Sequence, residues 1–464
     1  MNFFDTHAHL QDEKFERDLD RVLDRARAAG VTRILTLGDN LLNSRKAVSL
    51  ARKTPEVLAA VGVHPHAAAE YTPETESELQ LLAECERVVC IGEIGLDYHH
   101  HHFGHDKQRE VFRRQLALAR QHRLPVSMHC RDAYADLLED LEAERGQEIG
   151  GVCHCFSGTT QDARALVEMG FVLGVGGTCT YNRAEDLRES LAAVGIHHLI
   201  LETDSPYLSP QAKRGRRNEP ANLPITARTL SEMLGESYRD VERITNYNAE
   251  RAFRLSREYA PQAVFINSNQ IHVNLTNMCT NNCEFCARHG DGVYRGHQLL
   301  LDHDPDVDAI TGSILREEYK SYGDVVFSGL GESLFRLDEL QVVARAAKAA
   351  GKRVILQTNG QGLLLHGPSL WKKLEGLLDL VSVSLNAPDR DSYNAICHPH
   401  DRERAFPAVV EFIRQAKASG FPTVASAIDL PEVDLAATRR LADELGVPLD
   451  VNRRDPIFPE AVLA

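Results

Sequence analysis

Residues 3–10 of the chain read FFDTHAHL, an apolar stretch that ends in two histidines. Its composition predicts a β-strand. His7 and His9 are two positions apart, and alternate residues of a strand point to the same face. This stretch therefore predicts a first strand that presents two imidazoles side by side, an arrangement that suits a metal ion.

Seven more strand candidates follow, separated by amphipathic segments such as residues 15–30 and 107–123 that predict helices. The eight strand candidates are FFDTHAH, RILTLG, LAAVGVH, VVCIGE, PVSMHC, GVCHCF, FVLGVG and LILETD. Eight strand–helix units in about 255 residues suit a barrel of parallel strands. We therefore expect an α/β protein whose first domain, residues 1–256, is a (β/α)8 TIM barrel.

Metal-binding residue types recur at the ends of these strand candidates. They are His7, His9, Glu93, His129, His154 and Asp204. Strand ends of a parallel barrel meet at one mouth, where barrel active sites form. A hydrogen-bonded core residue explains any one histidine alone, but it does not explain six such residues at one mouth. The set favours a site for two divalent ions, with Glu93 between them.

Six motifs together resemble the TatD family of metal-dependent deoxyribonucleases: FDTHAHL, GVHPH, IGEIGLDY, HCRDA, CHCFSG and ETDSPYL…RGRRNEPAN. The resemblance extends from residue 3 to about residue 256. It implies a metallo-dependent hydrolase barrel that acts on DNA ends, often as a 3′–5′ exonuclease. It assigns the metals to the six residues named above. It also makes Asp204 the expected base, and we assign Glu93 to catalysis with it.

Four further residues near the predicted mouth are candidates for substrate contacts. They are His64, Arg131, Arg214 and Arg216. The last two lie in the basic loop KRGRRNEP, and such a loop at a metal mouth suits a phosphate backbone. A solvated surface loop explains each arginine about as well.

Four consecutive histidines, residues 99–102, follow Glu93 in the sequence. We expect them to form a solvated loop. A third metal site or a proton shuttle is the alternative.

After a last helix that ends near residue 255, the segment 257–270 breaks the pattern and predicts a linker. Six new strand candidates follow: IHVNLT, DVVFSG, RVILQTNG, LVSVSLNA, TVASAID and LDVNRRD. They predict a second domain, residues 271–464, that forms a partial (β/α)6 barrel.

Three cysteines, Cys279, Cys283 and Cys286, follow the first of these strands with the spacing C-x3-C-x2-C. The next cysteine, Cys397, is more than a hundred residues away. Cubane clusters usually take four thiolates, so three would leave one iron open to a small molecule. A zinc ion is the competing interpretation, but it needs a fourth ligand, which His289 could supply.

The cysteine motif resembles that of the radical S-adenosylmethionine superfamily. The segment VVFSGLGES is similar to the Gly-Gly-Glu-Pro motif of that superfamily, although Leu330 separates the glycines and Ser333 replaces the common proline. The resemblance covers residues 271 to about 458. It implies a [4Fe–4S] cluster on the three cysteines, S-adenosylmethionine held at Glu332, and an external electron donor of the flavodoxin or ferredoxin type.

The same resemblance places Ser384 and Asn386, in the segment VSVSLNAPD, next to the ribose of the bound S-adenosylmethionine. Hydrogen bonding at the end of a strand explains both residues equally well.

The bulk composition is ordinary for a globular protein. The chain has 464 residues, ten cysteines and a net charge of −15. We expect two domains, a cytoplasmic location with reduced thiols, and no membrane segment. The negative charge argues against a protein that coats polyanions, but it does not exclude a nuclease, because bound ions offset the repulsion locally.

The sequence thus predicts a bifunctional enzyme. Its first domain would hydrolyse phosphodiester bonds in a nucleic acid or nucleotide with two Mg²⁺, Mn²⁺ or Zn²⁺ ions. Its second domain would generate a 5′-deoxyadenosyl radical that acts on an unknown substrate. Two alternatives stay open: a non-catalytic sensor or docking role for the cluster domain, and acyl hydrolysis of the amidohydrolase type for the barrel.

Overall fold

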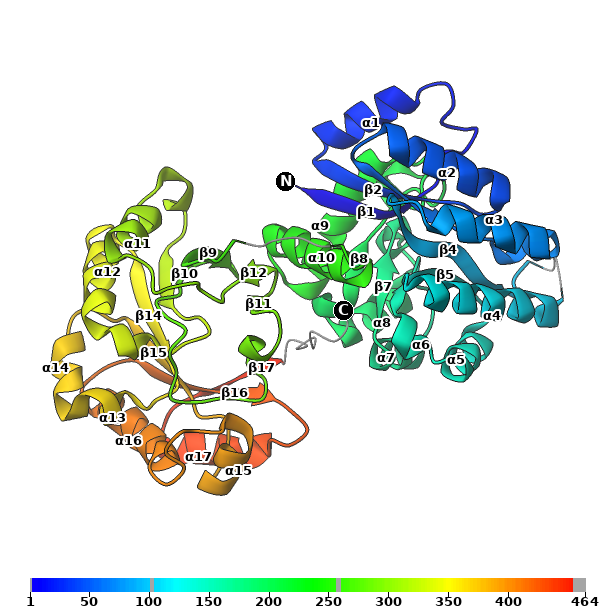
Figure 1. The fold of residues 1–464 in the computed structure, drawn as a ribbon. Helices are drawn as coiled ribbons and strands as arrows, with labels where there is room; N and C mark the ends of the chain where they lie inside the picture. Colours follow the sequence, from blue (N-terminus) through cyan, green and yellow to red (C-terminus); the bar gives the residue numbers. More distant parts are fainter. Residues whose placement is uncertain (1, 101–103, 256–259, 454–464) are drawn as a thin grey trace. The chain divides into compact units, whose positions relative to one another are not determined.

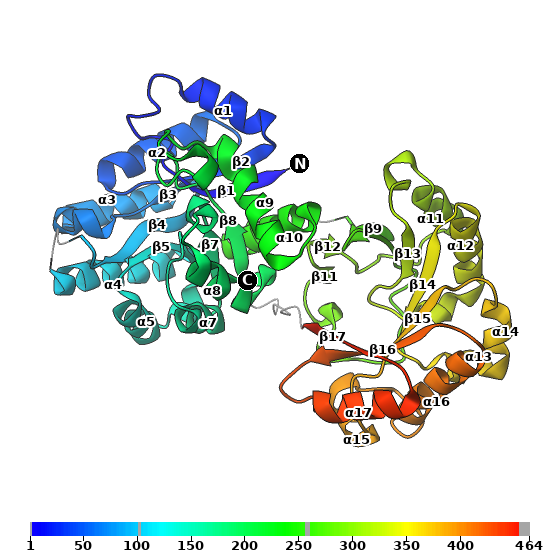
Figure 2. The same cartoon turned by 180° about the vertical axis from the view of Figure 1, so that it is seen from behind.

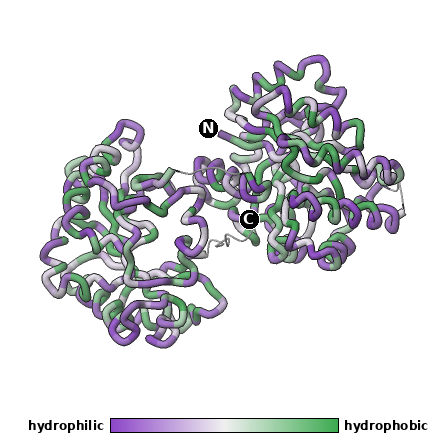
Figure 3. The backbone as a smooth tube through the Cα atoms, in the orientation of Figure 1, coloured by the Kyte–Doolittle hydropathy of each residue, from purple (hydrophilic) through white to green (hydrophobic). Residues whose placement is uncertain are grey.

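A computed structural model of the chain describes residues 2–100, 104–255 and 260–453 (Figure 1). The chain divides into a first unit, Met1–Arg257, and a second unit, Glu258–Ala464. Figure 2 shows the same ribbon from behind, and Figure 3 shows hydrophobic residues running through the interior of each unit. Among the described residues, no helix combines the length and the hydrophobicity that a membrane span requires.

The first unit is built on eight parallel strands that pair in sequence order. They are β1 (Phe3–Ala8), β2 (Val31–Leu37), β3 (Val57–Val61), β4 (Val88–Asp97), β5 (Val126–Arg131), β6 (Gly151–Cys153), β7 (Phe171–Val175) and β8 (Leu199–Leu201). A parallel bridge between Ala8 and Ser205 joins the two ends of the sheet. All eight strand candidates are present, and the predicted TIM barrel is confirmed.

Helices cover the outside of these strands (Figures 1 and 2). They are α1 (Leu19–Ala28), α2 (Leu41–Lys53), α3 (Pro73–Ala83), α4 (His105–His122), α5 (Tyr134–Ala143), α6 (Gly146–Ile149), α7 (Thr160–Glu168), α8 (Glu185–Val194), α9 (Leu223–Leu234) and α10 (Tyr238–Ala252). A short 3-10 helix, η1 (Pro65–Glu70), follows β3.

Side chains along the barrel strands alternate between two apolar cores. Phe3 and Ile34 belong to the large core between strands and helices, whereas Phe4 and Leu35 belong to a smaller core inside the barrel. Phe253, at the C-terminal end of α10, joins this inner core, with its ring centroid 6.0 Å from that of Phe4. Because Phe4 is the second residue of β1, the inner core fills the amino-terminal end of the barrel. The carboxyl-terminal end is left for polar side chains.

The second unit is built on a seven-stranded sheet with the order β17-β16-β15-β14-β13-β10-β9. Six strands are parallel: β10 (Gln270–Val273), β13 (Asp324–Phe327), β14 (Arg353–Thr358), β15 (Leu380–Ser384), β16 (Thr423–Asp429) and β17 (Leu449–Arg453). They correspond to the six strand candidates. Among the described residues, β17 pairs with β16 alone, so the sheet stays open as the predicted partial barrel does.

The helices of the second unit are α11 (Val307–Ile314), α12 (Leu337–Ala349), α13 (Gly362–His366), α14 (Leu370–Leu374), α15 (Arg390–Cys397), α16 (Ala405–Ala418) and α17 (Leu435–Leu445). A separate two-stranded ribbon, β11 (Val293–Tyr294) and β12 (His297–Gln298), follows the cysteine loop. The 3-10 helix η6 (Ala287–His289) lies between the cysteine loop and this ribbon.

The segment 257–270, which we expected to be a linker, contains a strand. Residues 256–259 lie outside the described residues, but β9 (Val264–Asn267) pairs antiparallel with β10 at the edge of the sheet. Ser268 and Asn269 connect the two strands with φ angles of +48° and +61°. Two residues with positive φ form the tight hairpin turn that matches the twist of its strands. The linker prediction was therefore wrong for residues 264–270, because an antiparallel hairpin interrupts the pattern of alternating strands and helices without interrupting the sheet.

Candidate functional site

A cavity of about 910 Å³ lies at the carboxyl ends of the barrel strands. β1, β4 and β5, together with the segments directly after β1, β6 and β8, bring the six predicted ligands to it. The six are His7, His9, Glu93, His129, His154 and Asp204. All of them except His7, which is fully buried, line the cavity itself.

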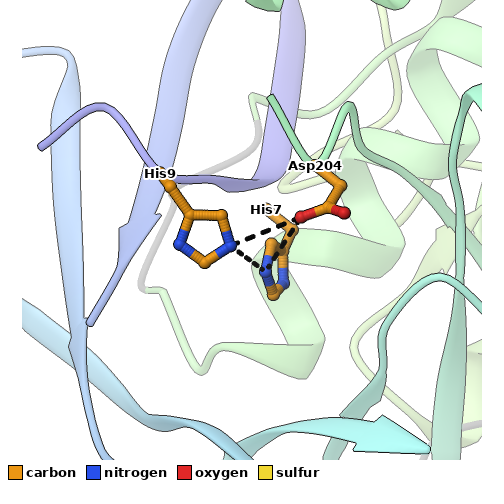
Figure 4. A group of neighbouring side chains, drawn as sticks. All are labelled: His7, His9 and Asp204. Atoms are coloured by element: carbon orange, nitrogen blue, oxygen red, sulfur yellow. Dashed lines mark hydrogen bonds and ion pairs between the residues drawn. The ribbon is translucent and has the colours of Figure 1, made fainter. Parts of the chain in front are cut away.

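His7, His9 and Asp204 form one half of this cluster (Figure 4). The Nε2 atoms of the two histidines are 3.3 Å apart, and Asp204 Oδ1 is 3.3 Å from His9 Nε2 and 3.7 Å from His7 Nε2. Glu93 Oε2 is 3.5 Å from each of the two imidazole nitrogens. Two nitrogens and two carboxylate oxygens thus point at one small volume.

The other half of the cluster forms around the second oxygen of Glu93. Glu93 Oε1 is 2.8 Å from His154 Nε2, 3.2 Å from His129 Nδ1 and 3.4 Å from His64 Nε2. His64, which we expected to contact substrate, therefore lies as close to Glu93 as the predicted ligands do. Glu93 faces both halves, one carboxylate oxygen toward each.

Glu93 is buried, with 4% of its surface exposed. Burial opposes its ionisation, but the nearby His64 and His154 imidazoles outweigh that effect and hold the pKa of Glu93 well below its ordinary value. Imidazole nitrogens face each other at 3.3 Å in both halves, between His7 and His9 and between His129 and His154. Two such nitrogens need a proton or an ion between them, and this donor set fits a pair of divalent ions.

His9 and His129 hydrogen-bond through their outer ring nitrogens, whereas the buried Nδ1 atoms of His7 and His154 have no hydrogen-bond partner among the described residues. His129 Nε2 lies 3.1 Å from Asp97 Oδ2, and His9 Nδ1 lies 3.1 Å from the carbonyl oxygen of Leu37. His154 Nδ1 is 3.7 Å from Glu202 Oε1. Such contacts fix the orientation and tautomer of a metal-binding imidazole.

Sequence reasoning missed two of these partners, Asp97 and Glu202. Both are fully or almost fully buried, and a buried carboxylate calls for a partner. Asp97 belongs to the motif GLDY at the end of β4, and Glu202 comes two residues before Asp204 in ETDSP. Their position at strand ends was the available signal.

The predicted substrate residues separate into two groups. Arg131 is exposed at the end of β5 and lines the cavity. The guanidinium of Arg214 instead lies over the ring of Tyr181, 4.5 Å from its centroid, and the backbone oxygen of Arg216 accepts a hydrogen bond from Ser209 Oγ. Neither Arg214 nor Arg216 lines the cavity in the described part of the chain.

The second unit holds a cavity of about 490 Å³ at the carboxyl ends of β10, β13, β14 and β15. Every residue that the radical S-adenosylmethionine resemblance singled out lines it. They are Cys279, Cys283, Cys286, Glu332, Ser384 and Asn386. Residues more than a hundred positions apart in the sequence thus share one cavity.

The cysteine geometry argues against a single zinc ion. Tetrahedral zinc holds its sulfurs about 2.3 Å away, which places them roughly 4 Å from one another. In the described chain, the groups of side chains whose ligand atoms all lie within 4.8 Å of one another include none of these cysteines, nor His289. Three sulfurs spread around a cavity suit a larger inorganic cluster.

Cys397, which is distant in the sequence, lies next to the cysteine loop. Its backbone oxygen accepts a hydrogen bond from the N–H of Asn282, at 3.1 Å. A hydrogen bond with Cys397, together with burial, raises the pKa of Cys283 well above its ordinary value. Cys397 itself is fully buried and does not line the cavity, so the loop still offers three thiols to the cavity.

Two glycines set the position of Glu332. A Cβ atom on Gly331 would lie 2.1 Å from the backbone oxygen of Thr276, and one on Gly329 would lie 2.1 Å from Asn274 Oδ1. The loop therefore lies directly against the chain that leads into the cysteine motif, and Glu332 N–H donates to the carbonyl oxygen of Met278 at 2.7 Å.

The carboxylate of Glu332 is fixed by three hydrogen bonds. Its oxygens accept from the N–H of Leu334 at 3.1 Å, from Asn359 N–H at 2.7 Å and from Thr358 Oγ1 at 3.0 Å. Burial raises the pKa of Glu332 in spite of these bonds. A carboxylate in this setting gains from a cationic partner in the cavity, and the amino group of an amino acid is one.

Comparison with known proteins agrees with the division of the chain into two units. The family model of TatD related DNase matches residues 4–254, and the model of the radical SAM superfamily matches residues 273–445. The chain is 38% identical over 253 residues to the uncharacterized metal-dependent hydrolase YabD of Bacillus subtilis, across 54% of this chain and 99% of that protein. It is 40% identical over 259 residues to the 3′-5′ ssDNA/RNA exonuclease TatD of Pantoea vagans, across 54% of this chain and 100% of that protein.

Among solved structures, the chain resembles YJJV, a TatD homologue from Escherichia coli. The TM-score is 0.52 at 31% sequence identity, and the match covers 55% of this chain and 98% of that one. The likeness therefore spans the first unit and nearly all of the relative. The chain belongs to the TatD related DNase family through its first unit, and its second unit is a radical SAM domain.

Proposed function

We propose that the first unit hydrolyses phosphodiester bonds in nucleic acid, as a 3′–5′ exonuclease does. The observation that carries this proposal is the cluster in which Glu93 directs one oxygen to His7 and His9 and the other to His129 and His154. The name of the Pantoea vagans relative, a 3′-5′ ssDNA/RNA exonuclease, supports the substrate class.

In this proposal, His7, His9 and Asp204 would hold one divalent ion, His129 and His154 would hold the other, and Glu93 would serve both sites. The ions supply Lewis-acid activation of water and charge neutralisation at the phosphoryl group. Mg²⁺ and Mn²⁺ suit the phosphodiester, and the imidazole-rich donor set also accepts zinc.

Asp204 is the residue we propose to take the proton from the attacking water. Its side chain is 13% exposed, against 5% for Glu93, so a water molecule in the cavity reaches its carboxylate more readily. Arg131, exposed at the cavity wall, is placed to contact a phosphate of the bound strand.

For the second unit we propose radical S-adenosylmethionine chemistry. Cys279, Cys283 and Cys286 would hold a [4Fe–4S] cluster, and Glu332 would receive the amino group of S-adenosylmethionine. When bound, the cluster would supply the electron for reductive cleavage of the C5′–S bond of S-adenosylmethionine, which gives methionine and a 5′-deoxyadenosyl radical. An external donor of the flavodoxin or ferredoxin type would return that electron. Ser384 and Asn386, at the cavity wall, would contact the ribose.

The domain limits in this proposal are residues 1–256 for the hydrolase and residues 264–464 for the radical domain, because β9 pairs with β10 in the sheet of the second unit. We place the protein in the cytoplasm, where thiols stay reduced.

The hydrolase proposal is tested with a single-stranded DNA oligonucleotide labelled at its 5′ end. With Mn²⁺ or Mg²⁺ we expect stepwise shortening from the 3′ end, no shortening with a chelator, and little shortening when the 3′-terminal linkages are phosphorothioates. An acyl ester is assayed in parallel. Turnover of the ester with no cleavage of DNA would contradict the proposal and favour the amidohydrolase alternative.

The radical proposal is tested by anaerobic reconstitution with iron and sulfide, followed by S-adenosylmethionine and dithionite. We expect 5′-deoxyadenosine to form. Recovery of intact S-adenosylmethionine on a fully loaded cluster would instead favour a sensor or docking domain.

A further inference from the structure

A second group of metal-binding side chains lies beside the cluster described above. Asp97 Oδ2 is 2.8 Å from His66 Nε2 and 3.1 Å from His100 Nδ1. The same oxygen is 3.1 Å from His129 Nε2. Three imidazoles from three different segments therefore converge on one carboxylate oxygen.

We propose that His66, Asp97 and His100 form a third divalent-metal site. Their ligand atoms all lie within 4.8 Å of one another. Imidazole nitrogens bind zinc at about 2.0–2.1 Å, so donors on opposite sides of one ion are roughly 4 Å apart. Small side-chain rotations therefore suffice to surround an ion. Two imidazoles and a carboxylate suit zinc, cobalt or manganese better than magnesium.

Local structure holds the donors in place. Asp97 ends β4 with 1% of its surface exposed, and its Oδ1 accepts the backbone N–H of His100 at 2.9 Å. His66 lies on η1, where its ring centroid is 4.9 Å from that of His100. The backbone of His100 thus fixes one oxygen of the carboxylate, while the imidazoles of His66 and His100 approach the other oxygen.

The proposed site opens onto the same cavity as the cluster of side chains around Glu93. His66, Asp97 and His100 all line that cavity, and the His66 and His100 side chains are 34% and 41% exposed. Three protein ligands leave at least one coordination position of a tetrahedral ion open. An ion here would bind an anionic group of a molecule in the cavity, away from Glu93.

The competing explanation is that Asp97 simply accepts hydrogen bonds from the three histidines. A carboxylate oxygen offers about two lone-pair directions, however, and three imidazole nitrogens lie within 3.1 Å of Asp97 Oδ2. His129 already uses that carboxylate as the partner of its outer nitrogen. An ion held by His66, Asp97 and His100 would bind the other two imidazoles, which would then not compete for the same oxygen.

The test counts bound zinc by equilibrium dialysis and elemental analysis. It uses the full chain with Cys279, Cys283 and Cys286 replaced by serine, because free thiols would bind zinc themselves. We expect about three zinc ions per chain in this triple-serine protein, which serves as the parent. We expect about two when His100→Ala or His66→Ala is introduced into it. Asp97→Asn is avoided because Asp97 also contacts His129.

The matched control is His99→Ala. His99 is the neighbour of His100 in the histidine run, but it pairs with the exposed Asp132 instead. We expect this control to keep all the zinc of the parent. Equal zinc in His100→Ala and the parent would overturn the proposal. So would equal loss in His99→Ala and His100→Ala, because it would mean that the histidine run binds zinc without Asp97. Circular dichroism establishes that each variant is folded.

Discussion

Replacing Glu93 by glutamine is expected to lower cleavage of single-stranded DNA by about a thousandfold, which corresponds to ~4 kcal/mol of lost transition-state stabilisation. Among the residues that the structure describes, Glu93 is the one side chain with an oxygen in each half of the cluster. An amide keeps one oxygen and turns the other into an N–H donor, which repels a cation and cannot ligate it. The variant therefore weakens both ion sites at once.

The measurement compares initial cleavage rates with saturating Mn²⁺, together with the bound metal content. Glu78→Gln is the control, since Glu78 lies on the exposed face of α3 and pairs only with Arg45 among the contacts described. A folded Glu93→Gln protein that cleaves within tenfold of the parent would contradict the role proposed for Glu93.

Replacing Cys286 by serine is expected to reduce 5′-deoxyadenosine formation by about a hundredfold or more, because a cubane cluster depends on its thiolate ligands. Cys286 lies in the cavity with Cys279, Cys283 and Glu332, and a serine hydroxyl is a poor substitute for a thiolate. The fully buried Cys397 does not line the cavity and is not placed to replace it.

Iron content, the absorbance of the reconstituted cluster and 5′-deoxyadenosine yield are measured together under anaerobic conditions. Cys85→Ser provides the comparison, because Cys85 is half-buried in the first unit and its thiol contacts Arg52. A Cys286→Ser protein with full cluster content and undiminished yield would show that this thiol does not hold the iron.

The barrel and the clustering of six metal-type side chains at its mouth were predictable because their signals are local. The spacing of His7 and His9 alone indicates that they share a face of a strand. Each of the other four residues follows an apolar run that predicts a strand. Parallel strands then bring these residues to one mouth whatever the details of the helices. Glu332 was instead placed near the cysteines by the resemblance of its motif to that of the radical S-adenosylmethionine superfamily, and Gly329 and Gly331 allow the close approach of the two chain segments.

What escaped prediction depends on contacts between distant residues. Asp97 and Glu202 are ordinary acidic residues in the sequence, and only the fold shows that they face His129 and His154. The basic loop shows the reverse case, since Arg214 turns onto Tyr181 and does not line the cavity. The sequence of an irregular loop has no periodicity from which the direction of its side chains could be predicted.

The inner core of the barrel bears on the order in which the protein is made. Phe253 packs against Phe4, so the floor of the barrel joins the beginning of the first unit to its very end. A growing chain cannot close this end of the barrel until residue 253 has left the ribosome, and at that moment the cysteine loop, which comes later in the sequence, has not yet emerged. The first unit can therefore fold first, and its metal-binding residues can take up ions before Cys279, Cys283 and Cys286 are exposed to compete for them.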